Sequence, residues 1–424
     1  GYAREDSDFD VLVIVRNLPG IKRRFDLLET EETKIWDKYK IKISSLLFEP
    51  EEIFQPVNPL LFGVLSGYKV LFGKAMWSVH LLKAKKGVRV WLSGNDRANP
   101  PVLHQIQEAQ KQDILVLEIS NRQLIGLKIS PHIAVLTTIS PTHLDDHASF
   151  SEYVEVKKNL IRYQKPSDYA ILNLENPCLR NFASETPAQV FWFGLRPRRG
   201  KKGAFLEKDK LAFFLPEKKE IMPRKDFPLL GDHNVLNALA SALCAYILGL
   251  SPTQIASRLK TFKGLKHRLE LVGKFNGVEF YNDSQATNPE AAQAALEAFP
   301  GREKIVIAGG KAKPNPEDFR EWILSMWDNK VKALLLIGEA KEQIYSLWQE
   351  ARQKNKKPAF YVAKCKDLEE AVKRAFSLLT GKEVVLLSPA CESFGEFKDY
   401  RERGEMFKKL VKEYAGRFHL HSSA

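Results

Sequence analysis

The sequence predicts an α/β protein in which two doubly wound domains, at residues 86–265 and 266–424, follow a smaller α/β piece at residues 1–85. Three observations support this prediction. Short β-branched apolar runs alternate with helix-like stretches from about residue 85 onwards, as in a parallel sheet covered on both faces. A basic, turn-rich stretch at 193–224 interrupts this series and predicts a hairpin at the sheet edge. A second series of strands starts near His267, so the boundary is expected just before it.

Each element is expected from the same pattern, in which apolar runs end in small or polar residues. The first series predicts strands within 87–94, 113–120, 132–140 and 168–175, then a buried helix within 229–250 that Asp232 or Asn234 could cap. The second series predicts strands within 273–284, 304–310, 332–338, 359–363 and 383–390. Its helices are expected around 289–299, 316–328, 339–354 and 367–380.

The composition indicates a globular protein of the cytoplasm, which we expect to be a monomer. Hydrophobic residues make up 44% and charged residues 28% of the 424 residues, with no apolar run long enough for a membrane span and no signal-peptide pattern. The net charge of +13 suits polyanionic ligands such as nucleotides, or a surface of dispersed lysines; no nucleic-acid partner is expected. The chain starts at Gly1 without an initiator Met, so we expect a truncated start. Four cysteines lack metal-ligand spacing: Cys178, Cys244, Cys365 and Cys391.

Residues 1–75 begin with two carboxylates at the start of an apolar strand. Asp8 and Asp10 are two positions apart, so alternation points both to one face, which suits a divalent metal that holds a nucleoside triphosphate. This segment resembles the small nucleotidyltransferase domains. The Gly-Ser that grips the triphosphate in that family is missing, and Lys42 and Ser44 stand where a third carboxylate is common. A solvated Asp pair on a folded remnant is the alternative.

Residues 388–404 carry the most informative motif of the chain, SPACESFGEFKDYRERG, directly after the strand-like run EVVLL. This motif resembles the C-terminal signature of the Mur ligases, in the branch that adds D-glutamate. The resemblance covers about residues 86–415. It implies an ATP- and Mg²⁺-dependent ligase of the acid–D-amino-acid type, which joins D-glutamate to UDP-N-acetylmuramoyl-L-alanine through an acyl phosphate in peptidoglycan synthesis. Small molecules are the expected partners.

The resemblance assigns further residues of the middle region to the metal and to the muramoyl substrate. LSGNDRANP matches the family's GGNxGxP loop, so Asn95 would contact the muramoyl substrate. Glu118 in LEISNRQL would bind magnesium, and His143 in THLDDH would bind a second magnesium. Lys157 in YVEVKKNL would be the lysine that the family carbamylates. Glu118, His143 and Lys157 would thus form the catalytic metal cluster.

The C-terminal motifs would supply the contacts to ATP and to D-glutamate. For ATP, the resemblance assigns Asn234 in GDHNVLNALA, Arg268 in FKGLKHRLE and Asp283 in YNDSQATNP, where Gln285 replaces the family's Lys. For D-glutamate, it assigns Lys313 in IAGGKAKPNP, where Ala312 and Pro314 replace the family's Asp and Gly. The remaining substrate-binding residues would be Ser393, Phe394 and Tyr400.

One expected element is degenerate. The family's middle domain opens with GTNGKT, a Gly-rich loop whose backbone amides hold phosphate, whereas this chain reads KVLFGKAMWS. Lys74 is the remaining phosphate-binding candidate, and Ala75 has no hydroxyl for magnesium. We therefore expect the ligase activity to be impaired. Two alternatives are a nucleotidyltransferase carried on a ligase-derived scaffold and a non-catalytic protein that binds a nucleotide or an amino acid.

Overall fold

A computed structural model describes the backbone of residues 9–14, 43–48, 69–72, 75–94, 112–139 and 149–421. Contacts divide the chain into two compact units, of which the second contains residues 256–424 together with 206–212 and 220–239. No helix of the described part is long and apolar enough to cross a membrane. At the N-terminus, two strands pair in parallel: β1 (Phe9–Ile14) and β2 (Ile43–Phe48).

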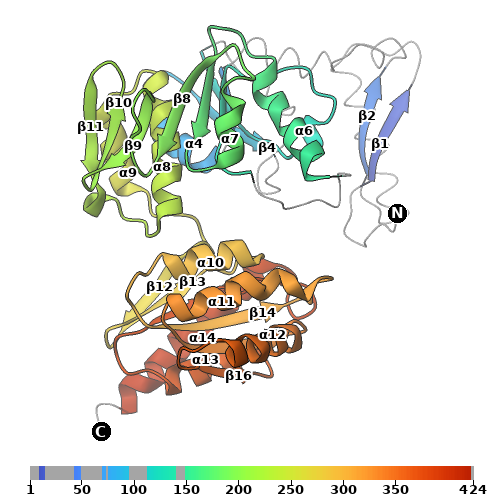
Figure 1. The fold of residues 1–424 in the computed structure, drawn as a ribbon, viewed down its shortest axis with the longest axis vertical. Helices are drawn as coiled ribbons and strands as arrows, with labels where there is room; N and C mark the ends of the chain where they lie inside the picture. The colour runs from blue at the N-terminus through green and yellow to red at the C-terminus, as the bar shows by residue number, and fades with distance from the viewer. Residues whose placement is uncertain are drawn as a thin grey trace. The chain divides into compact units, whose positions relative to one another are not determined.

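A mixed sheet of nine strands organises the first part of the chain (Figure 1). Its strands, in spatial order, are β11 (Lys218–Pro223), β10 (Lys210–Phe214), β9 (Gly203–Glu207), β8 (Gln189–Gly194), β7 (Tyr169–Asn173), β6 (Ile133–Leu136), β3 (Lys69–Phe72), β5 (Ile114–Glu118) and β4 (Val90–Gly94). The pairs from β9 through to β4 are parallel. The expected edge hairpin is present, because Lys208 and Asp209 join β9 to β10 with positive φ angles, as in a type I′ turn.

Helices connect these strands and cover the sheet. They are α4 (Ala75–Leu82), α6 (Phe150–Arg162), α7 (Pro177–Phe182), α8 (Asp232–Ile247) and α9 (Pro252–Thr261), with short 3₁₀ turns η2 (Arg122–Leu124) and η4 (Arg224–Asp226). Local capping sets where several begin: the Ser149 side chain accepts from the Glu152 N–H at the start of α6. Because α8 begins at Asp232, Asp232 and Asn234 lie inside its first turn, so the prediction that one of them precedes the helix as a cap is wrong.

The central sheet takes a strand from the segment that we assigned to the N-terminal piece. β3 lies between β5 and β6 and pairs in parallel with both. A two-residue connection, Gly73-Lys74, then leads into α4. The domain limits at residues 86 and 266 stay a prediction. Because β3 belongs to the central sheet and α4 follows it directly, we infer that the first limit lies before residue 69.

A second, separate sheet begins at Glu270, after the connector that contains His267. Its order is β12 (Glu270–Phe275), β13 (Val278–Asn282), β17 (Val384–Leu387), β14 (Lys304–Gly310), β15 (Val331–Gly338) and β16 (Tyr361–Lys364). All pairs are parallel except β12 with β13. The expected strand–helix alternation is therefore present, with one antiparallel strand at the edge.

Helices cover both faces of this second sheet because its strands are apolar on both sides. They are α10 (Pro289–Glu297), η5 (Pro316–Phe319), α11 (Arg320–Asp328), α12 (Lys341–Lys354), α13 (Leu368–Ser377) and α14 (Tyr400–His421). In β14, Val306 and Ala308 pack with α10, α11 and α12, whereas Ile305 and Ile307 pack with α13 and α14. The alternation of buried residues thus fixes a three-layer α/β/α unit.

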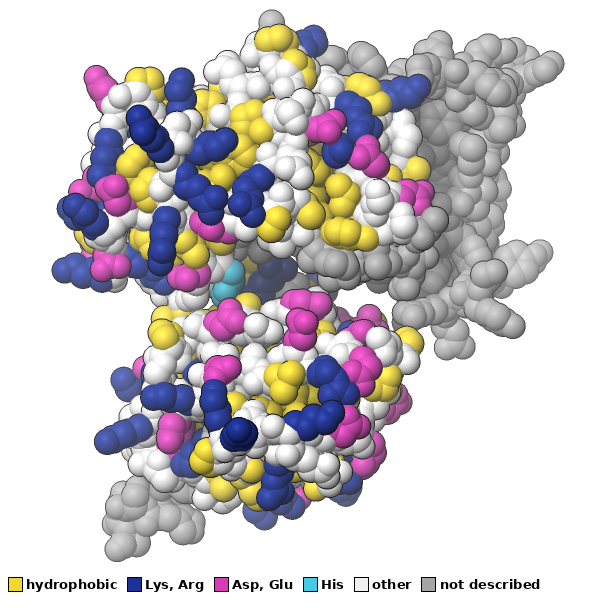
Figure 2. Space-filling view, viewed as in Figure 1, with side chains coloured by type: hydrophobic (Ala, Val, Ile, Leu, Met, Phe, Trp, Pro, Cys, Tyr) yellow, Lys and Arg dark blue, Asp and Glu magenta, His cyan; other side chains and the backbone are white. Residues whose placement is uncertain are grey.

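Charge is spread over the surface. Figure 2 shows Lys and Arg side chains over both units on the viewed face, with acidic and hydrophobic side chains between them. The cations of this face are therefore dispersed, as the second interpretation of the positive net charge expected.

Candidate active site

The candidate site lies at the carboxyl ends of the parallel strands in the second unit, where open α/β sheets place their ligands. β13 ends immediately before Asp283, and β17 ends immediately before Ser388. The Ser388 hydroxyl donates to Asp283 Oδ2 at 3.0 Å, and the Leu269 N–H donates to Asp283 Oδ1 at 3.1 Å. Burial raises the pKa of the Asp283 carboxyl to about 7. Asp283 therefore links two strand ends to the connector that carries Arg268.

Arg268 is presented to solvent by a turn in an uncommon conformation. His267 and Leu269 on either side have φ angles of 63° and 42°, which non-glycine residues rarely adopt. The Arg268 Nε donates to Gln285 Oε1 at 2.6 Å, and the Gln285 N–H donates to the His267 carbonyl at 3.0 Å. Gln285, where the resemblance led us to expect Lys, is thus the acceptor that orients Arg268.

His267 packs against the helix that carries Tyr400. Its ring is buried, and its centroid lies 5.8 Å from the Tyr400 ring centroid in an edge-to-face arrangement. Burial lowers the pKa of His267. A Cβ atom added to Gly404 would lie only 2.2 Å from His267 Nδ1. Gly404 therefore permits the close approach of α14 to the Arg268 turn.

Arg403 is a functional candidate that our sequence reasoning missed, although it lies inside the quoted C-terminal motif. The side chain is fully buried. It donates to the Ser284 carbonyl at 2.9 Å, to the Ser284 hydroxyl at 3.0 Å and to the Cys391 carbonyl at 3.0 Å. A weaker contact of 3.4 Å reaches the Gly309 carbonyl. One guanidinium thus ties the loops that follow β13 and β17 to the end of β14.

The expected D-glutamate residues lie in the same unit on three neighbouring segments. Lys313 follows β14 and is half-buried, with its Nζ 5.8 Å from the Phe319 ring centroid. Ser393 is buried after β17, and Phe394 beside it is 46% exposed. Tyr400 begins α14. These positions agree with a shared site, but the structure gives no contact among the four side chains.

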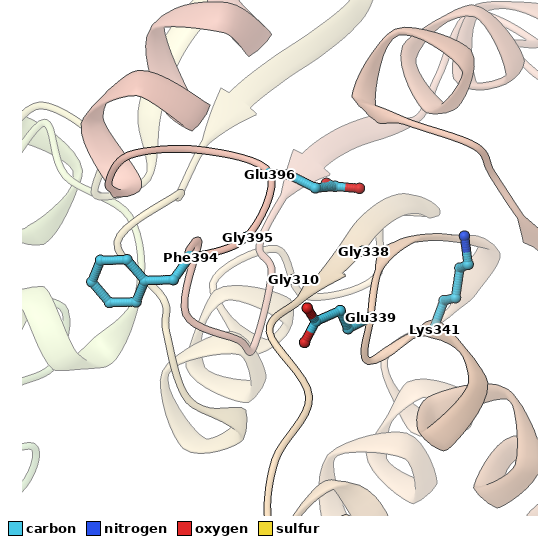
Figure 3. A pocket seen from close by; sticks show the side chains of 7 residues that line it. All are labelled: Gly310, Gly338, Glu339, Lys341, Phe394, Gly395 and Glu396. Carbon is cyan, nitrogen blue, oxygen red and sulfur yellow. The ribbon is translucent and has the colours of Figure 1, made fainter. Parts of the chain in front are cut away.

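A pocket of about 270 Å³ opens in the same unit, and of these four residues Phe394 lines it (Figure 3). Its lining is Gly310, Gly338, Glu339, Lys341, Phe394, Gly395 and Glu396. Figure 3 shows the Glu339 and Glu396 side chains on two different segments of the pocket, with Lys341 on one side and Phe394 turned away. A lining with both signs of charge suits a zwitterion. Our sequence reasoning missed Glu339, Lys341 and Glu396, because Glu339 and Lys341 lie where β15 leads into α12 whereas Glu396 follows β17, and only the fold brings these two segments together.

Two of the metal-cluster residues lie in the central sheet region. Glu118 is the exposed last residue of β5. Lys157 lies on α6, where burial lowers the pKa of its ammonium and its Nζ is 5.6 Å from the Tyr153 ring centroid. An exposed carboxylate fits a magnesium ligand, and a lysine with a lowered pKa is more readily carbamylated. Among the described residues, no group of three His, Cys, Asp or Glu side chains could hold a metal.

Other predicted site residues fall outside what the structure describes. These are Asp8, Lys74, Asn95 and His143, together with the side chain of Asp10. Whether Glu118, His143 and Lys157 converge is therefore still a prediction. Asn234 is described: its side chain amide donates to the Leu230 carbonyl at 2.7 Å. Asn234 thus holds the loop before α8.

The chain belongs to the Mur ligase family. Residues 77–245 match the Mur ligase middle domain, and residues 267–391 match the Mur ligase glutamate ligase domain. Two relatives are named UDP-N-acetylmuramoylalanine–D-glutamate ligase. That of Acetivibrio thermocellus is 40% identical and that of Clostridium kluyveri strain ATCC 8527 is 33% identical; each alignment covers 97% of this chain and 84% of the relative.

Solved structures support the same fold. A MurF ligase from Thermotoga maritima, solved with ADP, is 18% identical and aligns with a TM-score of 0.62 over 97% of this chain and 96% of its own. A pseudomurein peptide ligase from Methanothermus fervidus is also 18% identical, with a TM-score of 0.60 over 96% of this chain and 87% of its own. The alignments with the Acetivibrio thermocellus and Clostridium kluyveri relatives also run through most of residues 1–85, the segment that resembles the nucleotidyltransferase domains.

Proposed function

We propose that this chain is an ATP-dependent ligase that adds D-glutamate to UDP-N-acetylmuramoyl-L-alanine. The observation that carries the proposal is the 40% identity, across 97% of the chain, to a relative named for this reaction. The residues at the strand ends of the second unit are consistent with it, because they combine cations with a pocket of mixed charge. In this proposal, the protein acts in the cytoplasm and is a monomer.

The chemistry requires an activated carboxylate. The substrate carboxylate attacks the γ-phosphorus of ATP, ADP leaves, and an acyl phosphate forms. The amine of D-glutamate then attacks the acyl carbon, phosphate leaves, and the amine loses a proton as the amide forms. Magnesium, when bound, supplies charge neutralisation at the phosphates. Glu118, His143 and a carbamylated Lys157 would hold it, and Asn95 would contact the muramoyl substrate.

The described residues would perform binding and orientation. Arg268 would meet the ATP phosphates, held by Gln285, and Asn234 would lie near the nucleotide. Asp283 would reach the ribose, although both of its oxygens already accept hydrogen bonds from the protein. Lys313, Ser393, Phe394 and Tyr400 would hold D-glutamate, whose ammonium the Glu339 and Glu396 carboxylates attract.

A second candidate function is binding with little turnover. It is favoured by the two-residue connection between β3 and α4, which is too short to supply the amides of a Gly-rich phosphate loop. In that case Lys74 would be the one residue of this segment that contacts the ATP phosphates.

The test measures ADP release with magnesium-ATP, UDP-N-acetylmuramoyl-L-alanine and D-glutamate. We expect product with D-glutamate and none with L-glutamate. Calorimetry of ATP and D-glutamate binding separates the two candidates, because a binding protein would bind both without forming the amide. Amide formation with another amino acid in preference to D-glutamate would refute the proposal.

A further inference from the structure

The loop that carries Lys313 is held by one side chain from the next helix. The Lys313 N–H donates to Gln343 Oε1 at 3.0 Å, and Gln343 Nε2 donates to the Lys313 carbonyl at 2.9 Å. A primary amide thus pairs with both backbone groups of a single residue. Because two parallel hydrogen bonds fix orientation as well as position, the direction in which the Lys313 side chain leaves the backbone is set by Gln343.

The rest of the loop is tied down on either side of Lys313. The Lys311 N–H donates to the Glu392 carbonyl at 2.9 Å, and the Asn315 side chain accepts from the Glu317 N–H at 3.3 Å. Between these ties, Ala312 has no polar side chain and Pro314 has no N–H. Pro314 also restricts Lys313 to extended conformations. Gln343 therefore supports the part of the loop in which this chain departs from the family's Asp-Lys-Gly.

Gln343 stands on a rigid element. It lies in the first turn of α12, which Ile344 (0% exposed) and Leu347 (5% exposed) anchor in the core. The Ala340 N–H before this helix donates to the Gly310 carbonyl at 2.9 Å, which joins the helix start to the end of β14. Because α12 is packed in the core, the Gln343 side chain has a fixed position, and its hydrogen bonds fix the position of the Lys313 loop.

We propose that Gln343 is a positioning residue that orients Lys313 for D-glutamate. This inference depends on the proposed role of Lys313 in binding the amino acid. Gln343 acts through the backbone of Lys313 and needs no contact with the substrate. Its removal would let the Lys313 ammonium sample positions away from the D-glutamate carboxylate.

The test is a double-mutant cycle with the full chain. We expect Gln343→Met, which keeps side-chain length without hydrogen-bonding groups, to raise KM for D-glutamate about tenfold. KM for ATP and kcat should stay within about twofold of the unmodified chain. In a Lys313→Met background, Gln343→Met should raise KM for D-glutamate no further, because the residue through which it acts is gone. Gln349→Met, an exposed position on the same helix, is the matched control and should change nothing.

Three results would overturn the inference: an unchanged KM for D-glutamate in Gln343→Met, an equal rise with and without Lys313, or a similar rise in every KM. If Lys313→Met itself leaves KM for D-glutamate unchanged, the assignment of Lys313 fails, and the inference fails with it. This result is distinct from failure of Gln343 alone. Should Gln343→Met not fold, Gln343→Glu replaces it in the cycle, because it keeps only the acceptor for the Lys313 N–H.

Discussion

Single buried polar residues hold the candidate site together by pairing with backbone and hydroxyl groups. Arg403 donates to the loops after two strands, β13 and β17, and Asp283 accepts from Leu269 and Ser388. A buried charge without an opposite charge is costly unless its hydrogen-bonding groups are satisfied. These residues therefore make the arrangement of the strand ends sensitive to single substitutions and to pH.

Asp283 predicts a pH-dependent stability of the second unit. Its carboxyl has a pKa near 7 when folded and 3.8 when solvated, so the folded state retains a proton that the unfolded state releases. The associated stability is fully present below about pH 4, and it is lost as pH rises to about 7. Asp283→Asn carries a neutral isostere. Its free energy of unfolding, relative to that of the unmodified chain, should be higher at pH 8 than at pH 4 by on the order of 4 kcal/mol. Urea unfolding of both proteins at the two pH values measures this change. If the variant differs from the unmodified chain by the same free energy at both pH values, Asp283 ionises freely in the folded protein.

At the scale of elements, α14 depends on a glycine inside a helix. Gly404 weakens helix propensity, but a Cβ there would lie 2.2 Å from His267 Nδ1 and 2.9 Å from Asn282 Nδ2. The helix can thus approach the end of β13 and the Arg268 turn only with glycine at this position. Close packing here outweighs local propensity.

Gly404→Ala should therefore destabilise the protein by about 1–3 kcal/mol, as overpacking usually does. Gly416→Ala on the same helix is the matched control. No atom lies within 4 Å of a Cβ added there, so it should stabilise by up to about 1 kcal/mol through helix propensity. Thermal unfolding of the two variants compares them directly. A Gly404→Ala variant as stable as Gly416→Ala would mean that α14 shifts to accommodate the methyl group.

At the scale of the whole molecule, the sequence predicts a phosphate-binding site that is less complete than the D-glutamate-binding site. β3 and α4 have the order strand, connection, helix that a phosphate loop requires, but only two residues join them. The loss of preorganised phosphate contacts typically reduces turnover about a thousandfold. We expect the unmodified chain to release ADP well below about one per second, an ordinary enzyme rate.

Replacing residues 73–75 with the family's GTNGKT loop should raise turnover by about a hundredfold or more, with a lower KM for ATP. ADP release under saturating substrates measures this change. The same graft with its Lys changed to Ala is the control and should not restore activity. Turnover near one per second in the unmodified chain would show that another segment already supplies the phosphate contacts.

The sequence alone determined the elements and the family. Buried strands, turn residues and the order of motifs are local features, so apolar runs predicted most strands and four of the five α-helices that cover the second sheet, all but α14. The SPACESFGEFKDYRERG motif identified the Mur ligases. Only the tertiary structure decided which side chains act together. Gln343 holds a residue 30 positions away, Ser388 meets Asp283 across 105 positions, and Arg403 meets Ser284 across 119. Sequence spacing carries no signal for such contacts, because they arise when strands far apart in the chain bring their carboxyl ends to one edge of a sheet.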